Sequence, residues 1–148
     1  MAADKNRWWT SPAEAPSGKR VIITGHDNLG KYIDSGKYIF RVEATWEYDA
    51  LPDGFPVDSD AEMLEKITDA FHAALAREKA IVMTGIYTGD GKRDWIFYTK
   101  NLHIFSTVFN RALEPIPLIP FVIEAYSDPS WEEYAEMRRE SYIEPGDE

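Results

Sequence analysis

Apolar and polar residues alternate along residues 37–49. Five apolar residues occupy one set of alternate positions: Phe40, Val42, Ala44, Trp46 and Tyr48. The positions between them are polar: Arg41, Glu43, Thr45 and Glu47. Successive side chains of a strand point to opposite faces, so the pattern predicts a strand with one buried face and one polar face.

Helical spacing of apolar residues predicts two amphipathic helices. The first runs from Ser59, with a capping box to Glu62, and its apolar face is Leu64, Ile67, Phe71, Ala74 and Leu75. The second follows Asn101, and its apolar stripe is Leu102, Phe105, Phe109, Ala112 and Leu113. β-branched and aromatic residues predict strands at 20–24, 79–88, 93–100 and 121–127. Two short helices are also predicted: one that ends at Gly36, and one near the C-terminus that begins near Asp128.

From residue 38 onward the predicted order is β-α-β-β-α-β, which is typical of an α+β, ferredoxin-like sandwich. This fold places two helices on one face of an antiparallel sheet, with its first and third strands as the central pair. Residues 20–140 are predicted to form this single domain, including an N-terminal strand and short-helix extension and a short C-terminal helix. Residues 1–19 are predicted to be an irregular arm, with Trp8 and Trp9 docked on the domain, and residues 141–148 a frayed tail.

The glycine-rich stretch "TGIYTGDGKRDWIFYT", residues 84–99, invites comparison with a phosphate-binding loop. Such a loop requires a hydroxyl residue after Gly-Lys and a helix beyond it. Here Arg93 follows Gly-Lys, and the next residues predict a strand. Asp-Gly between two strands instead predicts a hairpin turn, and Gly85 predicts a bulge or a close backbone approach.

Charge and composition narrow the classes of function. With 26 acidic and 16 basic residues, the formal net charge of −10 disfavours direct nucleic-acid binding, which depends on Lys and Arg. The chain has no cysteine, no apolar run of membrane-spanning length and no secretory signal, so a cytoplasmic location is predicted. Aromatic residues make up 14% of the chain, which is more than a small core needs and favours a binding surface.

Candidate catalytic groups are few. His26, His72 and His103 lack the i, i+4 spacing of a helical metal site, so neither a metal nor a cofactor is predicted. Glu43 and Glu47 share one face of the first long strand, where paired carboxylates can do acid–base work. The simpler interpretation is that both belong to the solvated face of a one-sided sheet.

Several segments resemble an uncharacterised bacterial family, domain of unknown function 695. They are "VIITGHDNLGKYIDSGKY", "RVEATWEYD", "TGIYTGDGKRDWIFYT" and "DPSWEEYAEMR", and the resemblance extends over roughly residues 8–139. The family is similar in fold to the regulator of ribonuclease E activity B, a small acidic protein that binds a nuclease and restrains it. The resemblance therefore implies a ferredoxin-like fold and supplies no catalytic residues.

These observations favour a non-enzymatic binding or regulatory module. An acidic surface steers basic protein partners toward it, and the helix-free face of the sheet, with Arg41, Glu43, Thr45 and Glu47, is the predicted binding surface. The alternative is a small hydrolase or metal-assisted enzyme, with His26, Glu43 and Glu47 between this face and the N-terminal arm. Pairing of the open face with a second copy is a third possibility, and the oligomeric state stays open.

Overall fold

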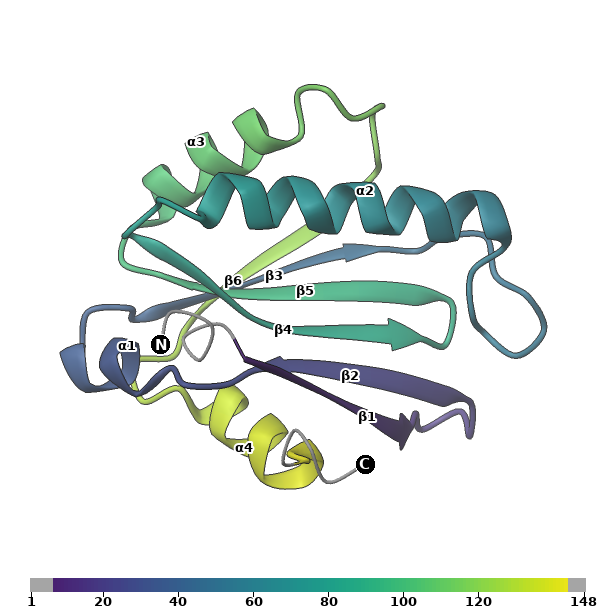
Figure 1. Ribbon diagram of the computed structural model, residues 1–148, viewed down its shortest axis with the longest axis horizontal. Coiled ribbons are helices and arrows are strands. Elements are labelled where there is room, and N and C mark those ends of the chain that lie inside the picture. Colours follow the sequence, from purple (N-terminus) through teal and green to yellow (C-terminus); the bar gives the residue numbers. More distant parts are fainter. Residues whose placement is uncertain (1–6, 144–148) are drawn as a thin grey trace.

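The computed structural model describes residues 7–143, which form a six-stranded antiparallel sheet and four helices (Figure 1). The strands are β1 (Trp8–Glu14), β2 (Arg20–His26), β3 (Phe40–Trp46), β4 (Ile81–Gly89), β5 (Lys92–Thr99) and β6 (Val122–Ser127). The helices are α1 (Gly30–Ser35), α2 (Asp58–Leu75), α3 (Leu102–Ala112) and α4 (Glu132–Ser141). Across the sheet the strands lie in the order β1-β2-β4-β5-β3-β6.

The α+β sandwich predicted from the sequence is confirmed. Strands β4, β5, β3 and β6 are adjacent in this order and antiparallel, which is the ferredoxin-like arrangement with β3 and β5 at its centre. Helices α2 and α3 cover the same face, as expected for two crossovers of one hand (Figure 1). Strands β2 and β1 extend the sheet beyond β4.

The main core lies between the sheet and the helices α2 and α3. Each helix contributes the apolar residues that its spacing predicts, including Phe71 from α2 and Phe109 from α3. The Phe71 ring lies 5.3 Å from those of Phe97 and Phe109, measured between centroids. Full burial of each such side chain stabilises the fold by about 1.5–3 kcal/mol.

The glycine-rich stretch is a β-hairpin, as predicted. Asp90 and Gly91 form its two-residue turn with φ values of 55° and 86°, and this left-handed conformation favours glycine. The pairing register shifts between Met83 and Gly85, which confirms the predicted bulge. A Cβ at Gly85 would lie 3.2 Å from the Met137 Cε atom, so the close neighbour is a side chain of α4.

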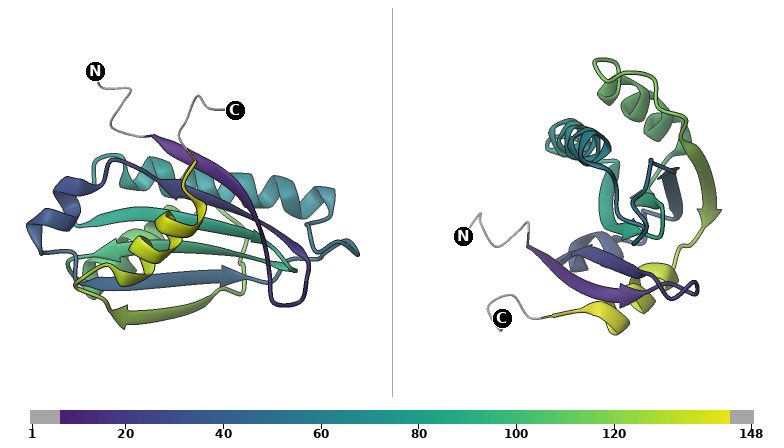
Figure 2. Two further views of the ribbon diagram at one scale, coloured as in Figure 1. Left: turned by 90° about the horizontal axis from the view of Figure 1, so that it is seen from below. Right: turned by 90° about the vertical axis from the view of Figure 1, so that its right-hand side faces the viewer.

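The prediction of an irregular N-terminal arm is wrong for Trp8–Glu14, which pairs with β2 as strand β1 (Figure 2). Trp9 is 2% exposed, and its Nε1 donates a hydrogen bond of 3.0 Å to Ser141 Oγ, while Trp8 is half-buried. Ser141 is therefore the buried end of α4 and does not belong to a frayed tail. Residues 1–6 of the predicted arm and 144–148 of the predicted tail lie outside the described residues.

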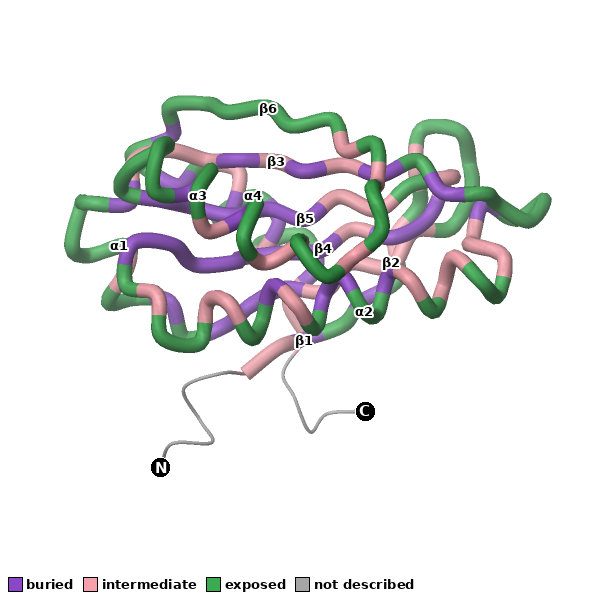
Figure 3. Tube along the Cα trace, turned by 90° about the horizontal axis from the view of Figure 1, so that it is seen from above, coloured by how far each residue is buried: buried purple, intermediate pink, exposed green. Residues whose placement is uncertain are grey.

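The second face of the sheet is not helix-free, because α4 packs across it (Figure 2). Trp131, just before α4, and Tyr134 and Met137 of α4 form a second apolar cluster with residues of the sheet, among them Tyr98, Ile96, Val82 and Trp9. Along β6 every residue is exposed (Figure 3). The part of this face that stays accessible is therefore the strip formed by β3 and β6.

Candidate functional site

The predicted binding residues on β3 are largely engaged in contacts within the chain. Arg41 Nε donates to Glu43 Oε2 at 2.9 Å, and Arg41 Nη1 donates to Asp128 Oδ2 at 2.9 Å. Thr45 Oγ1 donates to Asp94 Oδ1 at 2.6 Å. Glu47, beyond the end of β3, is exposed. Arg41 and Thr45 thus connect β3 to neighbouring segments, Glu43 pairs with Arg41 within β3, and the predicted role of these residues in binding stays a prediction.

Asp128, just before α4, is the centre of this network. Its carboxylate accepts hydrogen bonds from the Tyr98 hydroxyl at 2.7 Å and from the backbone amide of Glu132 at 2.9 Å, in addition to Arg41. Burial alone would raise the pKa of Asp128, but these hydrogen bonds outweigh burial and lower the pKa below its ordinary value. The ionised carboxylate therefore fixes the start of α4 on the sheet.

The predicted enzyme site does not form. Two strands, β4 and β5, separate β2 from β3, and three inter-strand spacings give a distance of about 14 Å. His26 also faces the side of α2, whereas Glu43 faces the side of α4. The hypothesis that His26 acts together with Glu43 and Glu47 is therefore wrong.

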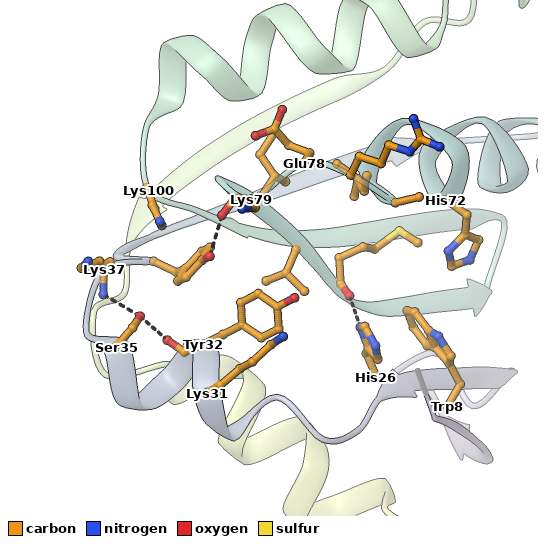
Figure 4. Close-up of a pocket in the computed structure, with 17 residues that line it drawn as sticks. Trp8, His26, Lys31, Tyr32, Ser35, Lys37, His72, Glu78, Lys79 and Lys100 are labelled. Carbon is orange, nitrogen blue, oxygen red and sulfur yellow. Dashed lines mark hydrogen bonds between the residues drawn. The ribbon is translucent and has the colours of Figure 1, made fainter. Parts of the chain in front are cut away.

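A cleft of about 760 Å³ lies instead between α1, the C-terminal end of α2 and the ends of the sheet strands (Figure 4). Five basic residues line it: Lys31, Lys37, Arg77, Lys79 and Lys100. Within residues 7–143 none of these five forms an ion pair. The acidic residue of the lining, Glu78, accepts a hydrogen bond of 3.0 Å from the Ala80 amide. The cleft is thus a basic region on a strongly acidic chain.

Two tyrosines position two of the ammonium groups. The rings of Tyr32 and Tyr38 meet edge to face, with centroids 5.1 Å apart. Lys31 Nζ lies 5.2 Å from the Tyr32 centroid, and Lys100 Nζ lies 5.1 Å from the Tyr38 centroid, within the range of cation–π attraction. Burial raises the pKa of Tyr38, whose hydroxyl donates to the Lys79 carbonyl at 2.6 Å. The Tyr38 phenol therefore stays neutral and adds no negative charge to the cleft.

The opposite end of the cleft carries Trp8, His26 and His72 (Figure 4). The Trp8 ring stacks on His26 with centroids 4.3 Å apart and an interplanar angle of 8°. His26 Nδ1 lies 2.8 Å from the Met83 carbonyl oxygen, which can only accept, so Nδ1 carries the proton. Burial lowers the pKa of His26, so the ring is neutral, and its buried Nε2 has no hydrogen-bond partner in the described structure.

Sequence reasoning missed this cleft, although one pattern points to it. Lys37, Lys79 and Lys100 each lie just outside a strand: before β3, before β4 and after β5. Phe40 and Ile81 both pair with Thr99, so these three strand ends meet at one end of the sheet. In the sequence these lysines are only hydrophilic residues next to predicted strands, and the strand order of the sheet brings them together.

A family of unknown function (DUF695) matches residues 9–137, and the chain therefore belongs to this family. No curated protein matches the chain. A conserved hypothetical protein, Aq1575 from Aquifex aeolicus, has a crystal structure with 15% sequence identity and a TM-score of 0.29. That match covers 92% of this chain and 58% of the other, so the chain spans little more than half of its length. In the described part of the chain, no helix combines the length and apolarity needed to cross a membrane.

Proposed function

We propose that the protein binds a small anionic ligand in the cleft between α1 and α2. The observation that carries this proposal is the set of five basic side chains around the cleft, none in an ion pair with a described residue, on a chain of net charge −10. Clefts lined by one sign of charge concentrate ligands of the opposite sign. A volume of about 760 Å³ is also within the range of small-molecule sites.

Titration of the ¹⁵N-labelled protein with pyrophosphate, followed by NMR, tests the proposal. We expect amide shifts at Lys37, Lys79 and Lys100, and weaker binding at high salt because ions screen exposed charges. The double variant Lys37→Glu/Lys79→Glu should lose these shifts. Its matched control is Lys66→Glu/Lys92→Glu, which makes the same change of charge at exposed positions outside the cleft. Equal losses in both variants, or no shifts in the wild type, would overturn the proposal.

A basic protein partner on the β3–β6 strip remains a second proposal. The exposure of β6 supports it, since an accessible strand edge can accept another extended chain. Affinity capture from a lysate at low and high salt checks it, and retention that does not depend on salt would count against steering by acidic residues. A cytoplasmic location belongs to the same proposal and rests on the absence of cysteine.

A further inference from the structure

We infer that the ligand of this cleft combines an anionic group with an apolar body. This inference rests on the proposed anion binding and specifies the chemical class of the ligand. Its basis is the unequal distribution of charge between the two ends of the cleft (Figure 4).

One end of the cleft is cationic. Figure 4 shows Lys37, Lys79 and Lys100 grouped at this end, and Lys100 Nζ lies 5.1 Å from the Tyr38 ring centroid. Their ammonium groups attract a phosphate or a carboxylate. The rings of Tyr32 and Tyr38 add apolar surface directly beside the charged groups.

The other end is mainly aromatic, and none of the lysines labelled in Figure 4 lies there. Trp8 stacks on His26 and meets the exposed His72 ring edge to face at 5.6 Å, and the cleft lining also includes the apolar residues Leu75, Val82 and Met83. His26 brings no charge to this end, because its ring is neutral. Its Nε2 is enclosed, and burial also lowers the pKa of His72, so apart from the His72 ring nitrogens this end offers ring faces and aliphatic groups to a ligand.

Size favours the same class of ligand. A bare inorganic anion would occupy a small part of about 760 Å³ and would leave the apolar wall hydrated. An aromatic ring or a short acyl chain attached to the anion would fill the apolar end and release that water. The bound molecule is therefore an aryl or acyl phosphate or carboxylate.

Isothermal titration of the full chain with inorganic phosphate, phenyl phosphate and octanoate tests this inference. Phenyl phosphate or octanoate should bind at least about tenfold more tightly than inorganic phosphate, which is the gain expected from burying a ring or chain. Whichever of the two binds more tightly identifies the apolar body as aryl or acyl. NMR shifts at the Trp8 indole and at His72 should appear with the tighter probe and not with inorganic phosphate.

The variant Leu75→Gln separates the two ends of the cleft. It should weaken the amphipathic probe about tenfold and leave inorganic phosphate binding unchanged, whereas Leu102→Gln, at an exposed position of α3, should change neither. If the variant does not fold, the wild-type shifts at Trp8 and His72 still decide the question. Equal affinity for all three probes would overturn this inference and keep the proposed function, while binding of none would overturn both.

Discussion

The two faces of the sheet are held to their helices by different interactions. On the side of α2 and α3, a continuous apolar cluster makes the contact. On the side of α4, a smaller apolar cluster is joined by a polar network in which Asp128 connects β3, β5 and the first turn of α4. Apolar burial is non-directional, whereas hydrogen bonds to a buried carboxylate depend on the position of each partner. The stability of the first face, on the side of α2 and α3, should therefore depend on side-chain volume. The stability of the second face, on the side of α4, should depend on individual hydrogen-bonding atoms.

Phe71→Ala should have the largest effect and should act on the whole fold. The ring is 2% exposed and contacts the rings of Trp95, Phe97 and Phe109, so its loss leaves a cavity at the centre of the core. Removal of such a ring lowers the free energy of unfolding by about 3–5 kcal/mol. Urea denaturation measures this change, and a loss below about 1 kcal/mol would show that the first face does not depend on volume.

Asp128→Ala should be less costly and should act on α4 first. The variant loses the cap of α4, the acceptor of the Tyr98 hydroxyl and one partner of Arg41, at a cost of about 2–4 kcal/mol. Hydrogen exchange should accelerate at the amides of α4 more than at those of α2. The control Asp34→Ala, at an exposed position, should leave both rates unchanged, and uniform acceleration in Asp128→Ala would remove the distinction between the faces.

Glu133→Gln should have the smallest effect and the opposite sign. Glu133 Oε2 accepts a hydrogen bond of 2.8 Å from Tyr87, whereas its buried Oε1 has no partner in the described structure. Burial raises the pKa of Glu133 above 4.5, so the folded state takes up this proton at a higher pH than the unfolded state. The charged form is therefore unfavourable at pH 7, and the variant should gain up to about 1 kcal/mol of stability there.

This gain should shrink as the pH falls toward and below 4.5, where the wild-type carboxyl becomes protonated in both states. Thermal unfolding of both proteins from pH 7 to pH 4 measures the difference. Glu136→Gln, at an exposed position of the same helix, is the control. A loss of stability at pH 7 would indicate that the carboxylate charge contributes favourably to this face.

The periodicity of apolar residues in the sequence predicted the sheet face that α2 and α3 cover. The alternation of residues 37–49 and the stripes of α2 and α3 give the order of elements and the central strand pair. The start of α2 was predicted less well: the helix begins at Asp58 after Val57, with no side-chain cap from Ser59. Strand β1 was missed because "SPAE" interrupts any alternating pattern, and its partner β2 is what orders it.

Two features of the candidate site and its surroundings could not be predicted from the sequence, because they depend on tertiary structure. Trp131, Tyr134 and Met137 lie on one side of α4, but their spacing does not say which surface they cover. Three lysines of the cleft belong to segments far apart in the sequence, and strand order alone makes them neighbours. The candidate site was therefore less predictable than the fold.

The hydrogen bond between Trp9 and Ser141 has a consequence for biosynthesis. The two residues are separated by 132 positions, so β1 leaves the ribosome long before the helix that buries Trp9. Until α4 emerges, the nascent chain exposes the indole and the apolar residues of the second cluster. The α2–α3 face is built from residues 40–127, whereas the α4 face is completed only once Ser141 is available to cover Trp9.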